Sequence, residues 1–336
     1  MNKKLHINLA KIFLSSIFLA LTMTSCDKKA DASANVGTMV CIKSFENIMR
    51  QEIIVYENVY RKAIIGCQYV TENEALQRLM SGDTRLAVLS RDLTESEVNR
   101  LKSRDSNLNV RSMQIAVDAL ALIVNPDNPV DKLTMKEVAR ILKGEVKTWS
   151  QIQPGAPDIP IKVVVDDPQS SVVNYMREKV LEGGKFDPKN VVTADSVSGV
   201  FNRVKDSKGC IGVIGVSWLG SDLGKIDVDT LMHTINSNDP IDGFAINDRI
   251  AKSGVKTLGL ITENSVALSP FYPTAENIYS GDYPLTRPIY MVTTAIPAGT
   301  LGKFYSFVTG VDGQKIIMKS GIMPARLKVN VYEIAN

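Results

Sequence analysis

Residues 119 to 144, ALALIVNPDNPVDKLTMKEVARILKG, contain one strand, one turn and one helix in succession. The apolar run 119 to 124 predicts a buried strand. Thr134 and Glu137 form a capping-box pattern, which predicts a helix beginning after Thr134, and Gly144 stands where that helix should end. One face of the helix is apolar and consists of Met135, Val138, Ile141 and Leu142. The stretch therefore indicates an α/β fold, in which strands alternate with helices.

The same alternation extends outward from this stretch in both directions. Two further capping boxes, Thr71-x-x-Glu74 and Thr94-x-x-Glu97, predict two more helices. Strand-like runs separated by helical periodicity occur at 38–42, 62–69, 85–90, 110–117, 119–124 and 161–165. This order predicts mixed or parallel sheets with flanking crossover helices. The length left after a leader is removed, about 310 residues, is more than one core usually fills and suggests two lobes.

The first 25 residues have the pattern of a secretory signal. Three lysines precede the apolar segment 12 to 23, which is too short to span a bilayer as a stable helix. The segment ends in Met23-Thr24-Ser25-Cys26, which resembles the lipobox of bacterial lipoproteins and implies a lipid on Cys26. The alternative is an ordinary signal peptide with an incidental cysteine. Residues 26 to 37 are mostly small, polar or charged and predict a flexible tether.

Charge and histidine content exclude several function classes. The chain has 39 basic and 36 acidic residues, and the leader carries three lysines and no acid, so the remaining chain is neutral. A neutral protein gives no electrostatic case for binding nucleic acid or anionic lipid. Only His233 lies beyond the leader, which excludes zinc binding or catalysis through paired histidines.

Three cysteines follow Cys26, an odd number for an oxidising compartment, so at least one thiol stays free. Cys41 and Cys67 lie in short apolar runs that predict buried strands, and Cys210 is the third. Two interpretations remain open: three inert thiols in the core, or a disulfide between Cys41 and Cys67, whose geometry is demanding.

Several segments together resemble one known family. They are Tyr283–Met291 (YPLTRPIYM), Gly313-Gln314, Gly321–Pro324, 119–130, Lys143–Trp149 and 208–215, and they occur in the family's order and rough spacing. The family is that of periplasmic phosphate-binding proteins, the solute-binding lipoproteins of ABC phosphate importers, with a type II periplasmic-binding-protein-like fold. The resemblance covers nearly all of residues 38 to 326.

The resemblance implies two α/β lobes with the ligand in the cleft between them. Lobe one would comprise 38–121 and 217–336, and lobe two 122–216. The two hinge crossings would fall at 120–125 and 212–216. Gly209, Gly212 and Gly215 have a spacing that fits no nucleotide-binding loop, so we interpret them as a strand that another part of the backbone approaches closely.

A candidate anion site follows the strand at 161–165. The residues Asp166 to Ser171 lead into a helix, whose free backbone N–H groups and adjacent hydroxyls could hold a phosphate oxygen. The alternative is that Ser170 is only the helix N-cap. The resemblance implies an anion site here, where the family has Ser-Gly-Thr and this chain has Ser170-Ser171-Val172. Asp166 stands where the family has an arginine, and a carboxylate beside a dianion is repulsive unless it is neutralised.

The resemblance implies further ligand residues in lobe one. Ser44 and Phe45 match the family's hydroxyl and aromatic pair, and Thr71 is near its next hydroxyl, although the capping box already uses the Thr71 oxygen. The family's aspartate at the end of the third strand corresponds to Arg91 or Asp92. If it is Arg91, its guanidinium could clamp two oxygens while Asp166 pairs with it or accepts the ligand's proton. The alternative is that Arg91 is a solvated loop residue.

Two hypotheses for function remain. The first is an extracytoplasmic lipoprotein, anchored through Cys26 and facing the periplasm or the cell exterior, which captures phosphate or a related oxyanion for the permease of an ABC importer. The second is a non-transport derivative with a degenerate pocket, acting as a sensor or a surface interaction protein. An enzyme is not expected, because no nucleophile has an adjacent base. We expect a monomer with no metal, no cofactor and no nucleic-acid partner.

Overall fold

The computed structural model describes residues 35–219, 226–237, 252–262, 265 and 268–326. The predicted signal peptide, Cys26 and most of the predicted tether lie outside the described residues. Val36–Asn336 form one compact unit, to which the described elements belong. Within the described part of the chain, no helix combines the length and apolar composition needed to cross a membrane.

The unit is built on a 10-stranded mixed sheet. Its main path runs β2 (Ala63–Val70), β1 (Asn35–Ile42), β3 (Leu86–Leu89), β11 (Thr286–Thr293), β4 (Arg111–Val124), β8 (Cys210–Gly215), β6 (Lys162–Val165) and β7 (Val191–Thr193). Two short strands, β9 (Lys256–Thr257) and β12 (Met323–Pro324), also pair with β4. A second sheet pairs β5 (Lys132–Thr134) with β10 (Gly259–Ile261). Because β1 and β6 lie in parallel pairs and β11 in antiparallel ones, the predicted mixed α/β class is confirmed.

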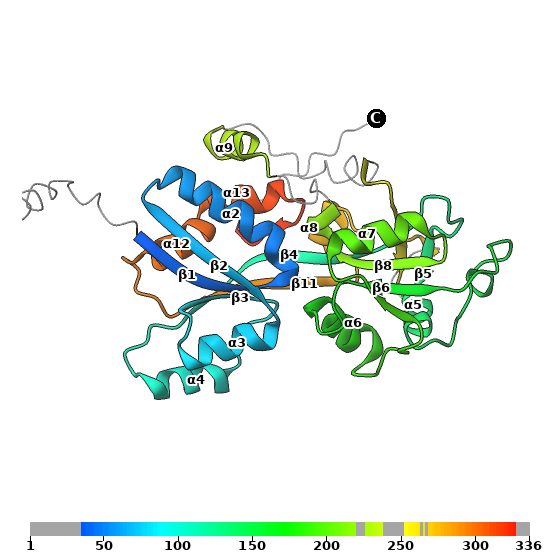
Figure 1. Cartoon of the computed structure of the whole chain (residues 1–336), viewed down its shortest axis with the longest axis horizontal. Coiled ribbons are helices and arrows are strands. Elements are labelled where there is room, and N and C mark those ends of the chain that lie inside the picture. Colours follow the sequence, from blue (N-terminus) through cyan, green and yellow to red (C-terminus); the bar gives the residue numbers. More distant parts are fainter. Residues whose placement is uncertain (1–34, 220–225, 238–251, 263–264, 266–267, 327–336) are drawn as a thin grey trace, which may run out of the picture. The chain divides into compact units, whose positions relative to one another are not determined.

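Strand β4 joins the two parts of this sheet. Its residues 111–119 pair with β11, and its residues 120–124 pair with β8. The sequence predicted two strands here, 110–117 and 119–124, on either side of Asp118. The structure has one continuous strand, since the Asp118 carboxylate is buried against an arginine of β11. In Figure 1, β4 and β11 run from the elements around β1 to those around β8.

Helices cover both faces of the sheet. Around β1 and β3 they are α2 (Glu46–Val59), α3 (Glu72–Ser81), α4 (Glu95–Arg104), α12 (Thr300–Val308) and α13 (Val311–Lys319). Around β6 and β8 they are α5 (Met135–Leu142), α6 (Ser171–Leu181), α7 (Val197–Asp206) and α8 (Val216–Leu219). Figure 1 shows α2, α12 and α13 on one face and α3 and α4 on the other, and it shows α6 and α7 on opposite faces of β6 and β8.

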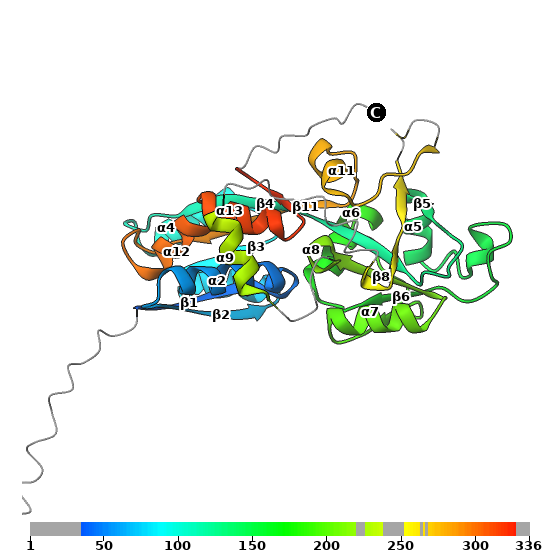
Figure 2. The ribbon, with the colours of Figure 1, turned by 90° about the horizontal axis from the view of Figure 1, so that it is seen from above.

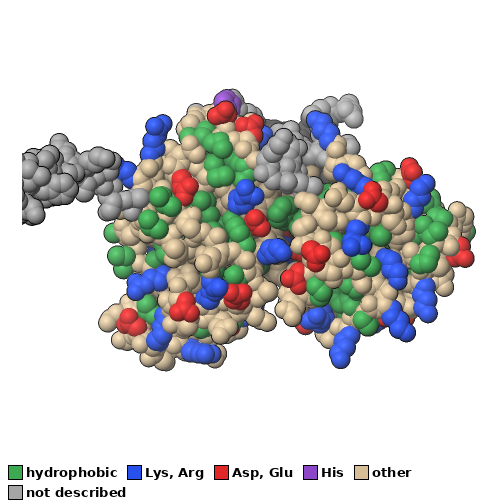
Figure 3. All heavy atoms as spheres, viewed as in Figure 1, with side chains coloured by type: hydrophobic (Ala, Val, Ile, Leu, Met, Phe, Trp, Pro, Cys, Tyr) green, Lys and Arg blue, Asp and Glu red, His purple; other side chains and the backbone are tan. Residues whose placement is uncertain are grey.

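The remaining helices are short. They are α9 (Val228–Asn236), α11 (Ala275–Ser280) and the 3-10 turns η1 (Lys43–Phe45) and η2 (Trp149–Gln151). Seen from above in Figure 2, α9 lies over the elements that include α2 and α13, and both of these helices contact it. The space-filling view in Figure 3 shows acidic and basic side chains interspersed over the left part of the visible face, while basic side chains predominate at the lower right.

The predicted helix starts are confirmed. The hydroxyl oxygens of Thr71, Thr94 and Thr134 each accept the backbone N–H three residues later, over 3.3, 3.3 and 3.1 Å. Helix α5 ends at Leu142, and Gly144 has φ of +72°, a left-handed conformation that a glycine adopts without strain. Capping is read correctly from sequence because both partners are neighbours in the chain.

Strand β8 carries two of the three glycines that the sequence singled out, Gly212 and Gly215, and Gly209 directly precedes it. A Cβ atom on Gly212 would lie 2.8 Å from side-chain atoms of Ile123 and Val200. Glycine is therefore required there because side chains of β4 and α7 approach the strand closely. The predicted approach of another part of the backbone occurs at Gly209 instead, where a Cβ would lie 2.5 Å from the backbone oxygen of Pro160. Residues 35–37, assigned to the tether, instead begin β1, where a Cβ on Gly37 would lie 2.7 Å from Leu301.

Two further predictions concern the lobes and the thiols. Residues 256–261 pair with β5 and with the end of β4, so the segment 217–336 contributes strands beside residues of the predicted lobe two. The division of the chain at 121 and 217 stays a prediction. Cys41 is buried and Cys67 and Cys210 are half-buried, and all three are free thiols in this structure.

Candidate functional site

A cavity of about 200 Å³ lies where β1, β2 and β6 lead into helices. Five hydroxyl-bearing side chains line it: Ser44, Tyr69, Thr71, Ser170 and Ser171. Four charged side chains line it as well: Lys43, Glu72, Glu74 and Asp167. The chain thus brings together half of the residues that the sequence and the family resemblance named, from segments far apart in the sequence.

Ser170 and Ser171 open helix α6 as predicted, but their hydroxyls have different partners. Ser170 is the N-cap, and its oxygen accepts the N–H of Val173 over 3.3 Å. The Ser171 hydroxyl instead lies against the hydroxyl of Ser44 and receives a hydrogen bond from an arginine at 3.0 Å. The backbone N–H groups of a first helical turn have no acceptor within the helix, so this end of α6 can donate to an anion.

Ser44 and Phe45 form the short turn η1 that leads into α2. The backbone oxygen of Ser44 accepts the indole N–H of Trp218 over 3.1 Å, and Asn47 donates to the backbone oxygen of Ser217 over 2.9 Å. These bonds fix η1 and the start of α2 against α8. Phe45 is fully buried and does not line the cavity, so it supports the site from behind.

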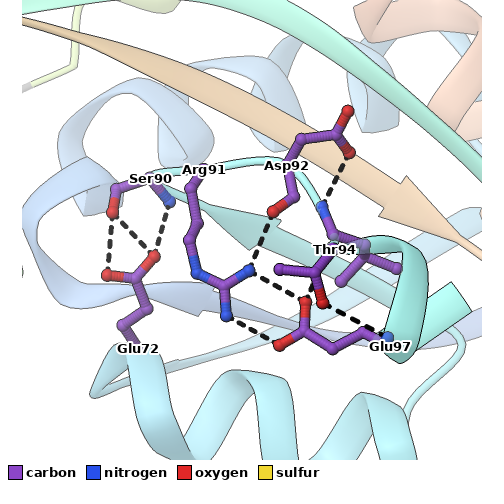
Figure 4. Close-up of polar contacts among 7 residues, drawn as sticks. Glu72, Ser90, Arg91, Asp92, Thr94 and Glu97 are labelled. Carbon is purple, nitrogen blue, oxygen red and sulfur yellow. Dashed lines mark hydrogen bonds and ion pairs between the residues drawn. The ribbon is translucent and has the colours of Figure 1, made fainter. Parts of the chain in front are cut away.

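Helix α3 contributes Thr71 and two carboxylates. The Thr71 oxygen accepts the N–H of Glu74, so the cap uses one of its two lone-pair positions. Glu72 accepts the N–H of Ser90 at 3.0 Å and the hydroxyl of Ser90 at 2.6 Å, which ties the start of α3 to the end of β3. Figure 4 shows this pair beside the loop that follows β3. Glu72 was not singled out from the sequence.

The structure does not bring Arg91 and Asp92 to the cavity. The Arg91 guanidinium donates to both carboxylate oxygens of Glu97, at 2.9 and 2.8 Å, and to the backbone oxygen of Asp92 (Figure 4). Its side chain is 44% exposed, and this ion pair holds the pKa of Glu97 down at about 2. Asp92 accepts the N–H of Leu93 and the hydroxyl of Ser112. Arg91 is therefore a partly exposed loop residue, which agrees with the alternative interpretation of this arginine.

Asp166 lies at the end of β6, buried just below the cavity rather than in its lining. Burial raises the pKa of its carboxyl, while the backbone N–H of Asp167 and the hydroxyl of Ser170 oppose that rise. Its Oδ1 has no hydrogen-bond partner among the described residues. The predicted pairing of Asp166 with Arg91 is absent, since Arg91 is bonded to Glu97 instead.

A second residue that sequence reasoning missed is Arg287, on β11. Its Nε and Nη2 donate to Oδ2 of Asp118 at 3.1 and 2.9 Å, and its Nη1 donates to the Ser171 hydroxyl. The guanidinium also lies over the ring of Phe45, 4.6 Å from its centroid. A signal was present: Arg287 shares the alternating inward side of its strand with Leu285, Ile289 and Met291.

The arrangement offers hydrogen-bond donors to a small anion. The starts of α3 and α6 and the 3-10 turn η1 meet the cavity with hydroxyls. Backbone N–H groups at helix starts carry partial positive charge. The described residues contain no group of three or more potential metal ligands. Among the lining residues Lys43 is basic, and Arg287 lies one hydroxyl behind the surface.

Comparison with known proteins identifies the family. Residues 30–312 match the PBP superfamily domain, and the chain belongs to this superfamily. It is 24% identical over 316 residues to the phosphate-binding protein PstS of Pseudomonas aeruginosa, covering 90% of this chain and 86% of that one. It is 23% identical to PstS of Borreliella burgdorferi, covering 93% of this chain and 96% of the relative.

Solved structures show the same fold. A putative phosphate ABC transporter substrate-binding protein from Clostridium perfringens, with bound phosphate, matches with a TM-score of 0.63 at 20% identity, covering 87% of this chain and all of that one. An ABC-type phosphate transport receptor from Vibrio cholerae matches with a TM-score of 0.58 at 24% identity, covering 85% and 99%. The predicted family resemblance and the two-lobed fold class are confirmed.

Proposed function

We propose that the protein captures inorganic phosphate, or a closely related oxyanion, in the cavity at η1 and the starts of α3 and α6. It then delivers the anion to the permease of an ABC importer. The observation that supports this most is the convergence of two helix starts, the turn η1 and five hydroxyl side chains on one cavity. Relatives named as phosphate-binding proteins, which match along most of their length, support the same ligand.

The anchoring and location belong to the same proposal. The chain is exported by its leader, carries lipid on Cys26, and works as a monomer outside the cytoplasmic membrane. The ligand roles of Ser44, Thr71, Ser170 and Ser171 are part of it, with Phe45 as a support. The protein binds its ligand and performs no chemistry on it. These statements rest on the lipobox-like sequence, the polar tether and the cavity lining.

A second candidate function is a non-transport derivative with a weakened pocket. The observation in its favour is the acidity of the cavity, which three carboxylates line while Asp166 lies buried beneath it. Each of these carboxylates repels a dianion unless it is protonated or already paired. Glu72 and Glu74 are engaged with Ser90 and Arg78, which reduces this repulsion and favours the first candidate.

Equilibrium dialysis distinguishes the two candidates. A chain beginning at Ser33, which lacks Cys26, is dialysed against labelled phosphate with sulfate as the competitor. The first candidate predicts saturable binding that sulfate displaces poorly, and loss of affinity in Ser44→Ala. The matched control is Ser81→Ala, an exposed serine at the far end of α3. Absence of binding at millimolar phosphate would rule out the transport function and leave the second candidate.

A further inference from the structure

Arg287 is held rigidly behind the cavity. It is 1% exposed and its partner Asp118 is fully buried. Two of its N–H groups go to one carboxylate oxygen, and the plane of the guanidinium packs on Phe45. The remaining contact, from Nη1, reaches the hydroxyl of Ser171 over 3.0 Å. The position of this N–H is therefore set by the core and not by a ligand.

The chemistry of the partners fixes which atom donates. A guanidinium has donors only, so the Ser171 oxygen must accept from Arg287, and its own hydrogen must point elsewhere. The hydroxyl of Ser44 is the next group within hydrogen-bond reach of Ser171. If Ser171 donates to Ser44, the hydrogen of Ser44 is left for the cavity, which both serines line.

We propose that Arg287 is a positioning residue, which orients the hydroxyl hydrogens of Ser171 and Ser44 so that this wall of the cavity presents donors. The wall then selects a ligand atom that only accepts, such as an unprotonated oxygen of an oxyanion. The inference rests on the proposed function and deepens it, because it states which part of the anion faces the serines. A buried cation acts here through two hydroxyls, without touching the ligand.

A double-mutant cycle on phosphate affinity tests the relay. Arg287→Lys keeps a positive charge beside Asp118 but loses the fork that also reaches Ser171. We expect Arg287→Lys and Ser44→Ala each to weaken phosphate binding, measured by titration calorimetry, by about 10- to 100-fold. The double variant should be little weaker than the worse single variant, since each change breaks the same chain. In a Ser171→Ala background, Arg287→Lys should have little further effect.

The control cycle replaces Ser44 with another hydroxyl of the same cavity. Thr71 caps α3 and has no hydrogen bond to Arg287 or Ser171 among those the structure describes. The fold-losses of phosphate affinity caused by Thr71→Ala and Arg287→Lys should therefore multiply in the double variant. Multiplied losses in the Ser44 cycle as well would overturn the relay and leave Arg287 a structural residue. If Arg287→Lys fails to fold, the cycle of Ser44→Ala with Ser171→Ala preserves the buried ion pair, and independent losses there also overturn the relay. A wild-type protein without phosphate binding would overturn the proposed function and the relay together.

Discussion

Arg287 and Asp118 face each other directly across neighbouring strands β11 and β4, with Nη2 2.9 Å from Oδ2. The pair lies next to the point where β4 exchanges β11 for β8 as its partner. A Cβ atom on Gly215 would lie 3.0 Å from the Asp118 carboxylate, so β8 closes over the pair as well. One buried ion pair thus connects the junction of the sheet to a hydroxyl of the cavity.

Removing one partner of this pair should be far worse than removing both. Arg287→Met leaves the Asp118 carboxylate buried without its counter-ion, and we expect it to lower the free energy of unfolding by about 3 to 5 kcal/mol. Arg287→Met combined with Asp118→Leu should cost clearly less, because no uncompensated charge remains. Urea unfolding followed by circular dichroism measures both. Equal destabilisation in the single and double variants would show that shape, not charge, governs this site.

Glu52 should make the protein less stable as pH rises. It lies on the inner side of α2, fully buried, and neither carboxyl oxygen has a hydrogen-bond partner among the described residues. Burial raises the pKa of Glu52 well above its usual range, and Asp312 adds to the rise. The pKa of Glu52 is higher in the folded protein than in the unfolded chain. The contribution of Glu52 to stability is therefore fully present below the unfolded pKa and is lost as pH rises toward the folded pKa.

Glu52→Gln tests this, because an amide does not titrate. We expect the melting temperature of the variant to exceed that of the wild type at pH 8, with the difference shrinking as pH falls toward 4. Glu178→Gln, at an exposed position on α6, is the control and should change neither the melting temperature nor its dependence on pH. Parallel pH profiles for wild type and Glu52→Gln would mean that Glu52 is solvated or paired.

Arg91→Ala should leave phosphate binding nearly intact. The guanidinium is bonded to Glu97 and 44% exposed, away from the residues that line the cavity. A pair this exposed contributes less than about 1 kcal/mol at neutral pH. The pKa of Glu97 is lowered from its ordinary value of 4.5 to about 2. The contribution of the pair to stability is therefore fully present above pH 4.5 and is lost as pH falls toward 2. Calorimetric titration and acid unfolding check both statements, and a large loss of affinity would place Arg91 at the ligand.

The elements that could be predicted from sequence are those with local causes. Two helix starts were located correctly because the capping residue and its partner are close in sequence. These pairs are Thr134 with Glu137 and Ser170 with Val173. The continuity of β4 could not be predicted in this way. Asp118 is compatible with a buried strand only because Arg287, 169 residues away in the chain, supplies its counter-charge.

The residues of the site also divide into those with local causes and those that depend on distant parts of the chain. Ser170 and Ser171 were named because they stand where a strand runs into a helix, and Ser44 and Thr71 because they match the family's hydroxyl positions; the cavity lining includes all four. Arg91 was considered because it or Asp92 corresponds to the family's aspartate, whereas the direction of its side chain depends on Glu97 in the following helix. The pattern of β11 indicated that Arg287 faces inward, but not which hydroxyl it meets.

The thiols provide a test that needs no ligand. Cys41 is fully buried, and burial raises the pKa of its thiol well above the usual range, with the neighbouring Cys67 adding to the rise. Since the thiolate is the reactive form, Cys41 should be alkylated slowly in the native protein, and the half-buried Cys67 and Cys210 faster. Mass spectrometry of peptides after timed treatment with iodoacetamide measures each rate.

A chain that begins at Ser33, purified without reductant, distinguishes the two interpretations of the cysteines. Three free thiols should be alkylated after denaturation if Cys41, Cys67 and Cys210 are all reduced, as they are in this structure. A disulfide between Cys41 and Cys67 would leave Cys210 alone reactive. Cys210→Ala is the control, because it should remove one thiol and leave the melting temperature nearly unchanged at its half-buried site. A single reactive thiol in the parent chain would establish the disulfide and overturn the free-thiol assignment.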